Sequence, residues 1–201
     1  MKPDRTKSIQ THFEENGGIM KTSDLREIGV STRAIKEMLD SGLIEKIRHG
    51  HYIWPGKADA LSDIEVAAKL IPQGVVCLFT AIEYYELSTV NPSAICIALP
   101  RNVNVPILPQ TPCIKIYRMT MKHFELGISD AEPDGAAMRI FDIEKTVCDC
   151  FKYDKEIEKS VALEVLKNYI TRGNCNIQKL FEYAKILGKK RVIQPYVEAM
   201  L

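Results

Sequence analysis

The chain has 201 residues, of which 46% are hydrophobic and 26% charged, and its formal net charge is +1. This length and apolar content support one large or two small packed domains, and the near-neutral balance excludes a globally basic coat protein or a strongly acidic tail. No apolar run approaches the roughly 18–20 residues that span a bilayer, and no signal-peptide core is visible at the N-terminus. We therefore expect a cytoplasmic protein with no membrane partner.

The six cysteines and four histidines show no metal-ligand spacing. No Cys-x-x-Cys pair occurs, and Cys148 and Cys150 point to different faces of a predicted helix. Cys77, Cys96 and Cys113 lie in or beside apolar, strand-like runs, where a thiol behaves as a small hydrophobe. The sequence therefore predicts no metal site, no cofactor and no disulfide framework.

The N-terminal region predicts three helices in succession. The first covers residues 6–15. The second is short, with Ser23 as its expected N-cap and Gly29 in the turn that ends it. The third runs from the cap Ser31 to about residue 41, where Gly42 ends it. Its buried face is formed by side chains at three- and four-residue spacing, namely Ile35, Met38 and Leu39.

A two-stranded hairpin is predicted directly after the third helix. Its strands cover residues 44–48 and 51–54, with a tight turn at His49-Gly50. Two short helices joined by a turn and followed by such a hairpin have the order of a winged helix-turn-helix, whose second helix fits the DNA major groove. The sequence thus indicates double-stranded DNA as a partner.

The candidate DNA contacts lie on the outer face of the third helix and on the hairpin. Arginine can bind a guanine edge bidentately, whereas lysine more often meets phosphate as a point charge. The six candidates are Thr32, Arg33, Lys36, Lys46, Arg48 and His49. Residues 1–57 carry ten Lys or Arg against eight Asp or Glu, a balance of only +2. Ordinary solvated charges, or a protein-contact module, therefore remain alternatives to DNA binding.

The boundary between two domains is expected near Pro55-Gly56-Lys57, because this turn-rich stretch follows the hairpin. Residues 1–57 would form the winged helix and residues 58–201 the second domain. This second part alternates between helical and strand-like patterns. Its helices are expected after the caps Ser62, Thr80 and Asp142, over residues 63–70, 81–87 and 143–152. Its strands are expected over residues 75–78, 94–99, 114–118, 124–128 and 137–141, with a turn at Pro133-Asp134-Gly135.

The last fifty residues are predicted to be helical, with apolar stripes typical of a bundle core. Asn176 is the expected cap of the middle helix. A basic patch there, formed by Lys185, Lys189, Lys190 and Arg191, is either a solvated end or a second contact with phosphate or a partner. The predicted fold class is α+β: an N-terminal winged helix-turn-helix followed by a mixed α/β domain that ends in a helical bundle.

Four segments in order resemble the AbiEi-type antitoxins, which are transcriptional regulators of type IV toxin–antitoxin (abortive infection) systems. Residues 18–25 (GIMKTSDL) and 42–52 (GLIEKIRHGHY) are similar to the opening and the end of the family's winged helix. Residues 80–87 (TAIEYYEL) resemble its capped, alanine-containing helix. Residues 143–151 (IEKTVCDCF) resemble its Glu-Arg-Thr-x-x-Asp helix, with Lys145 where arginine is typical. That departure weakens any argument for bidentate pairing at this position.

The resemblance implies two activities and no enzyme. The winged helix would bind inverted repeats upstream of its own operon and repress it. The C-terminal domain would oppose a toxin with a nucleotidyltransferase fold, without forming a stable complex with it.

The cluster Glu144, Lys145, Thr146 and Asp149 allows two interpretations. Helical spacing places Lys145, Thr146 and Asp149 on one flank of the helix. In the favoured interpretation, Asp149 pairs with Lys145 or Thr146 and holds the helix against the strands. In the other, the four residues form a surface for antitoxin activity.

Two further function classes are alternatives to a regulator of this type: an enzyme and a ligand-sensing repressor. Nucleotidyl transfer needs a Gly-Ser turn followed by paired carboxylates on a strand. The nearest stretch, residues 127–134 (GISDAEPD), has alternating Asp130 and Glu132 but reads as a turn. No P-loop, Gly-x-Ser-x-Gly or His-Glu-x-x-His motif occurs. A winged-helix repressor that senses a small ligand and has no toxin partner stays the alternative.

Overall fold

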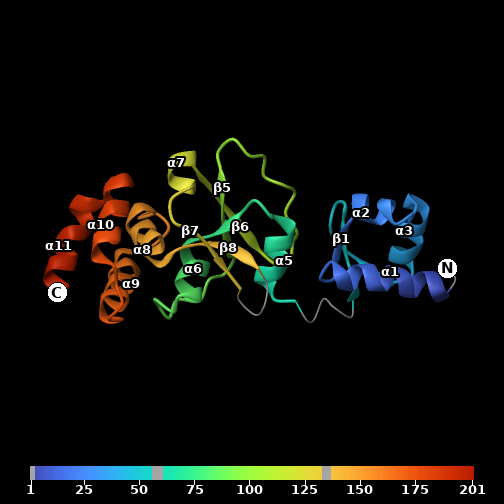
Figure 1. Cartoon of the computed structure of the whole chain (residues 1–201), viewed down its shortest axis with the longest axis horizontal. Coiled ribbons are helices and arrows are strands. Elements are labelled where there is room, and N and C mark those ends of the chain that lie inside the picture. The colour runs from blue at the N-terminus through green and yellow to red at the C-terminus, as the bar shows by residue number, and fades with distance from the viewer. Residues whose placement is uncertain (1–2, 56–60, 133–136) are drawn as a thin grey trace. The chain divides into compact units, whose positions relative to one another are not determined.

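The computed structural model describes residues 3–55, 61–132 and 137–201, and its chain divides into two compact units (Figure 1). Unit 1 comprises residues 1–72 together with 106–113, and unit 2 comprises residues 73–105 together with 114–201. The boundary predicted at residue 57 and the turn predicted at 133–135 both lie outside the described residues. Helices together with one antiparallel and one mixed sheet confirm the α+β class. None of the helices within the described ranges is long and apolar enough to cross a membrane.

Unit 1 contains the predicted three helices and hairpin. The helices are α1 (Pro3–Glu15), α2 (Thr22–Glu27), α3 (Thr32–Asp40) and, after the hairpin, α5 (Asp63–Leu70). The strands are β1 (Ile19–Lys21), β2 (Glu45–Arg48) and β3 (His51–Ile53), which form one antiparallel sheet in the order β1-β3-β2. Strand β1 was not predicted, because three residues are too few to show the alternation that marks a strand.

Of the N-caps predicted for α2 and α3, one is correct and one is wrong. Ser31 caps α3 as predicted, and its Oγ accepts a hydrogen bond from the Ala34 N–H at 3.2 Å. Ser23 does not cap α2, which begins earlier with Lys21 at the N-cap. There the Asp24 carboxylate accepts the Lys21 N–H at 2.9 Å, so the carboxylate at the third helical position satisfies the free donor.

The core of unit 1 joins all of its N-terminal elements. Its buried side chains are Ile9, Phe13, Met20, Leu25, Val30, Ile35, Met38, Ile44 and Tyr52. Trp54 packs against this core, and its ring centroid lies 5.6 Å from that of Phe13. Helix α5 is tied to the same unit, since Lys69 Nζ donates to the Asn16 carbonyl at 3.3 Å. The predicted cap Ser62 is confirmed, with its Oγ bound to the Glu65 N–H.

Unit 2 is built on a five-stranded mixed sheet in the order β6-β5-β4-β8-β7. Its strands are β4 (Val75–Val76), β5 (Ile95–Pro100), β6 (Ile114–Met119), β7 (Ile128–Ala131) and β8 (Met138–Phe141). The pairs β5–β6 and β4–β8 are parallel, and the pairs β4–β5 and β7–β8 are antiparallel. Every residue of β5 is buried, as expected for a strand inside a sheet that is covered on its faces.

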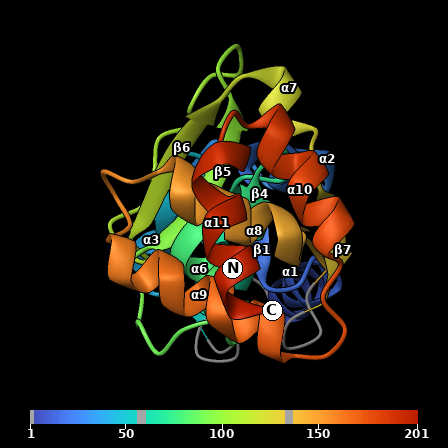
Figure 2. The ribbon, with the colours of Figure 1, turned by 90° about the vertical axis from the view of Figure 1, so that its left-hand side faces the viewer.

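The helices of unit 2 centre on α8 (Ile143–Lys152). It contacts α6 (Leu78–Tyr84), α9 (Lys159–Thr171), α10 (Ile177–Ile186) and α11 (Lys190–Met200), and Figure 2 shows these C-terminal helices gathered around it. The predicted caps Asp142 and Asn176 are confirmed by their bonds to the N–H groups of Lys145 and Lys179.

Two predictions in unit 2 were wrong. Thr80 does not cap a helix over 81–87, because the chain turns at Leu78 (φ +47°) and α6 begins there after the N-cap Cys77. The buried Thr80 hydroxyl instead accepts the Cys96 N–H at 2.9 Å. Residues 124–128 do not form a strand. Phe124 ends the short helix α7 (Met121–Phe124), residues 125–127 form a turn, and β7 begins only at Ile128.

The six cysteines carry free thiols in two different environments. Four are buried: Cys77, Cys96, Cys148 and Cys150. Burial raises the pKa of each of these thiols. Cys113, in unit 1, is exposed, and Cys175, in unit 2, is partly exposed.

Candidate functional site

The predicted DNA-contacting residues of α3 lie on its solvent-exposed face. Thr32, Arg33 and Lys36 are all exposed, whereas Ile35 and Met38 on the opposite face are buried. The Arg33 side chain is 90% exposed, and its Nε lies 3.1 Å from Glu37 Oε1, four residues further along the helix. The basic face of α3 therefore includes a carboxylate that partly neutralises it.

Arg26, on α2, is an additional cation at this face that the sequence argument missed. Its Nη2 donates to the Thr32 Oγ1 at 3.1 Å, which places the guanidinium beside the first turn of α3. The tight turn between α2 and α3 brings the end of one helix to the start of the next. The signal was available in the sequence, since a helix-turn-helix motif implies this proximity.

The hairpin has the predicted turn, and two of its three candidate residues are exposed. Gly50 has φ +75°, a conformation that favours glycine, and its carbonyl accepts the Thr22 N–H at 3.0 Å. Lys46, on β2, and His49, in the turn, are exposed. They are placed to meet a ligand outside the protein, and contact with DNA stays a prediction.

Arg48 is used differently from the prediction. Its guanidinium donates to the carbonyls of Ile107 and Leu70, at 2.9 Å each, and lies 2.9 Å from His51 Nε2. Burial lowers the pKa of Arg48. Because these bonds are all inside unit 1, Arg48 fixes the base of the hairpin to α5 and to residues 106–113. Arg48 thus positions the hairpin, and its contact with phosphate stays a prediction.

The second candidate cluster, on α8, lies inside unit 2. The side chains of Lys145 and Asp149 are 0% and 1% exposed and form an ion pair. The Lys145 Nζ also lies 4.2 Å from the Phe141 ring centroid, a cation–π contact. Burial raises the pKa of Asp149, and the charge of Lys145 opposes that rise. This geometry is the favoured structural interpretation, in which Asp149 pairs with Lys145.

A functional surface formed by these four residues does not fit the structure. Thr146 is 1% exposed and donates to the Phe141 carbonyl, and Glu144 is 6% exposed. Helix α8 is covered on several sides by other helices, so the side chains that looked polar in sequence point into the protein. None of the four is available to contact a partner directly.

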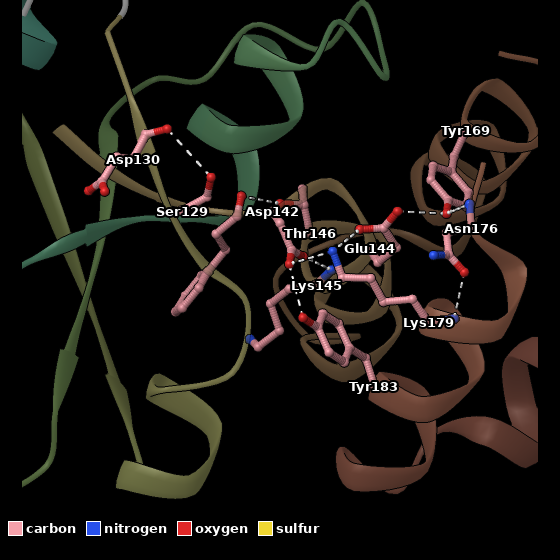
Figure 3. A network of polar contacts seen from close by, with 11 residues as sticks. Ser129, Asp130, Asp142, Glu144, Lys145, Thr146, Tyr169, Asn176, Lys179 and Tyr183 are labelled. Atoms are coloured by element: carbon pink, nitrogen blue, oxygen red, sulfur yellow. Dashed lines mark hydrogen bonds and ion pairs between the residues drawn. The ribbon is translucent and has the colours of Figure 1, made fainter. Parts of the chain in front are cut away.

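Glu144 and the cap Asp142 instead organise a polar network at the start of α8 (Figure 3). Lys179 Nζ lies 3.1 Å from Asp142 and 2.9 Å from Glu144, so α10 supplies one cation for two carboxylates. Burial opposes the charge of Lys179, but its bonds to Glu144 and Asp142 raise its pKa.

Two tyrosines complete this network. The Tyr183 hydroxyl donates to Asp142 and the Tyr169 hydroxyl donates to Glu144, each at 3.0 Å. Burial, together with the Asp142 charge, raises the pKa of Tyr183 to about 12. Sequence reasoning found Asp142 and Glu144 but missed these partners, because 25 to 41 residues separate the hydroxyls from their carboxylates. The network joins α8 to α9 and α10.

Residues 127–134, the stretch nearest to a nucleotidyl-transfer motif, include β7 at the edge of the sheet of unit 2. Asp130, in β7, is paired with Arg139 of β8 in the antiparallel register, and it is exposed. Glu132 is also exposed, and Pro133 and Asp134 lie outside the described residues.

A comparison with known protein families finds a match for the N-terminal module. Residues 7–53 match the family described as transcriptional regulator, AbiEi antitoxin. This match runs from within α1 to the end of β3 and confirms, over that segment, the resemblance found in the sequence. No match is found among curated proteins.

The fold as a whole is similar to that of a solved protein. The crystal structure of the Rv2827c protein from Mycobacterium tuberculosis superposes with a TM-score of 0.64, covering 92% of this chain and 72% of that chain. The two sequences are 10% identical. At this identity the likeness shows a shared fold only.

Proposed function

We propose that this chain is a transcriptional autorepressor and antitoxin of a type IV toxin–antitoxin system. One observation carries the proposal. The segment that matches the AbiEi antitoxin regulators folds as a winged helix-turn-helix whose α3 exposes Thr32, Arg33 and Lys36. In such a module the second helix of the motif enters the major groove of DNA.

The exposed groups divide by chemistry into two roles on DNA. Arg33 is the candidate for reading a guanine edge, because a guanidinium can form two parallel hydrogen bonds with it. Lys36 and Lys46 are candidates for phosphate contacts, which position a protein without reading sequence. Arg26 adds charge beside the start of α3. The operator is proposed to be an inverted repeat upstream of the chain's own operon.

Unit 2 is proposed to oppose a nucleotidyltransferase-like toxin without forming a stable complex. The network around Lys179 joins α8 to α9 and α10, and Lys145, paired with Asp149 within α8, contacts Phe141 of β8. Their role in this proposal is indirect, since they support whichever outer surface carries the activity.

A footprint of the purified chain on the DNA upstream of its own gene tests the regulator. We expect protection of an inverted repeat that persists at moderate salt. Replacing Arg33 and Lys36 by alanine should abolish this protection, and Lys7→Ala, an exposed lysine of α1, is the matched control. If both residues meet phosphates, the slope of log affinity against log salt falls by about 0.9 for each. Unchanged protection in the double variant would refute the placement of the recognition helix.

Co-expression with the neighbouring gene tests the antitoxin. The wild-type chain should restore growth of cells that express the toxin, and the Arg33→Ala, Lys36→Ala variant should restore it equally well. Recovery of both proteins in one stable complex would contradict the proposed mode of action. Loss of rescue in the DNA-binding variant, at equal abundance of the chain, would show that the two activities are not separate.

A further inference from the structure

A hollow of about 250 Å³ lies among three helices of unit 2. Its walls come from the end of α8, the start of α9 and the first half of α11. The apolar lining consists of Phe151, Ile157, Ala162, Val192 and Tyr196, with the buried Cys150 beside them. The Phe151 and Tyr196 rings are nearly parallel, with centroids 6.2 Å apart, so no third ring fits between them. A ligand would lie against this aromatic wall.

The charged groups at this hollow are unbalanced. Lys189 forms an ion pair with Asp154 at 3.2 Å. Lys159 lies with its Nζ 5.4 Å from the Tyr196 ring centroid, and no carboxylate among the described residues is within ion-pair distance of it. The lining therefore carries two ammonium groups but one carboxylate, and that carboxylate is paired with Lys189 alone. That combination suits an anion with an apolar body.

We propose that this hollow binds a small planar organic anion, such as an aromatic carboxylate. Its ring would lie against Tyr196 and Val192, and its carboxylate would meet the ammonium groups of Lys159 and Lys189. Pockets for drug-sized ligands measure about 300–1,000 Å³, so a cavity of about 250 Å³ fits a molecule of one or two rings. The site lies beyond the proposed repressor and antitoxin activities and does not depend on either.

Binding at this site would connect α8, α9 and α11 through one ligand. A ligand that binds only the folded chain raises its stability in proportion to the logarithm of its concentration over Kd. The unfolding temperature should therefore rise with added ligand. Helix α8 also carries the Lys145–Asp149 pair. A ligand bound at this site would therefore stabilise the helix at the centre of unit 2.

Titration of the full-length chain with 2-naphthoate, followed by ligand-observed NMR and by thermal unfolding, tests the site. We expect a Kd of about 1 mM or tighter, since a ligand of this size has few atoms with which to gain affinity. The amine of the same shape, 2-naphthylmethylamine, should bind at least about tenfold more weakly, because it meets two cations. Equal binding of the acid and the amine would overturn the proposal.

Two pairs of variants locate the binding. Lys159→Gln should weaken naphthoate binding about tenfold, whereas Lys167→Gln, an exposed lysine of the same helix outside the hollow, should not change it. Val192→Trp should fill the hollow and abolish binding, and Ala199→Trp adds the same bulk to an exposed position of α11. Absence of binding by the wild-type chain up to about 10 mM, or binding that survives both Lys159→Gln and Val192→Trp, would overturn the proposal.

Discussion

Two ion pairs with the same spacing occupy opposite environments in this molecule. Arg33 and Glu37 on α3 are four residues apart, as are Lys145 and Asp149 on α8. The first pair has side chains that are 90% and 61% exposed, and the second has side chains that are 0% and 1% exposed. The same helical pattern thus forms an outer surface in one unit and a buried brace in the other.

The difference teaches how tertiary packing decides the role of a charge. An exposed pair contributes about 0–1 kcal/mol, because water solvates each charge nearly as well as its partner does. Its groups are free to exchange that partner for a phosphate or a base. A buried pair has lost its solvation, so removing one member leaves an uncompensated charge in the interior. Only the exposed pair is suited to recognise a ligand.

The largest expected effect comes from breaking the buried pair. Lys145→Met should destabilise the chain by about 3–5 kcal/mol, because Asp149 would be left buried without its cation. Arg33→Met is the matched control and should cost less than about 1 kcal/mol. Urea unfolding followed by far-UV circular dichroism measures both. The double variant Lys145→Met, Asp149→Leu should recover most of the loss, and equal costs for Lys145→Met and Arg33→Met would contradict the comparison.

The next effect concerns how Arg33 meets DNA. Arg33→Lys keeps the charge but removes the planar fork. If Arg33 reads a guanine edge, this change should weaken operator binding by about 1–3 kcal/mol and leave the salt dependence of binding unchanged. Affinity for the operator measured at several salt concentrations checks this. An affinity that is unchanged for the operator would show that Arg33 contacts phosphate and reads no base.

A smaller effect of opposite sign, a gain in operator affinity, is expected when Glu37, the ion-pair partner of Arg33, is replaced. Glu37 places a carboxylate on the face that is proposed to meet a polyanion, and Glu37→Gln removes that repulsion while keeping the helix. Operator affinity should rise by a few-fold, corresponding to about 0.5–1 kcal/mol. Glu14→Gln, on an exposed position of α1, is the control. A weaker operator complex for Glu37→Gln would mean that Glu37 itself contacts a base or positions Arg33.

The smallest expected effect is a pH dependence at the base of the hairpin. Burial, and then the Arg48 charge, lower the pKa of His51 below its usual 6.5. The folded chain therefore favours neutral His51, so its contribution to stability is full above pH 6.5 and is lost as the pH falls from 6.5 through the lowered pKa. His51→Gln should flatten this part of the stability–pH curve.

His123 contributes with the same sign, because burial and the charge of Lys152 lower its pKa as well. Its Nδ1 lies 2.7 Å from Lys152 Nζ. A His123→Gln variant separates the two histidines, since His51 is in unit 1 and His123 in unit 2. If His51→Gln leaves the acid limb of the curve unchanged while His123→Gln flattens it, the role assigned to the Arg48–His51 contact is wrong.

Local signals predicted much of this fold from the sequence. Ser31, Ser62, Asp142 and Asn176 cap helices where expected, because a cap depends only on residues within one turn. Thr80 was misread, since its hydroxyl serves a backbone group on a strand 16 residues away. A polar side chain with a distant partner cannot be distinguished from a cap by sequence pattern alone.

In the candidate site, too, the sequence predicts features that depend on local spacing and misses those that depend on distant partners. The apolar residues of α3 recur at three- and four-residue spacing, which predicts that Arg33 and Lys36 lie on the exposed face. The structure confirms that both are exposed. The fixed position of Arg48 does not follow, because its partners are carbonyls of Leu70 and Ile107, far along the chain. Likewise, only the helices packed around α8 show that Glu144 and Asp149 lie inside.

The division of thiols between buried and accessible positions provides a pair of natural labelling sites. Burial raises the pKa of the four buried thiols, and we therefore expect them to react slowly with maleimides. Cys113 and Cys175 are the accessible ones, and they lie in different units. A donor and an acceptor fluorophore attached to the unmodified sequence would therefore report the distance between the two units by energy transfer.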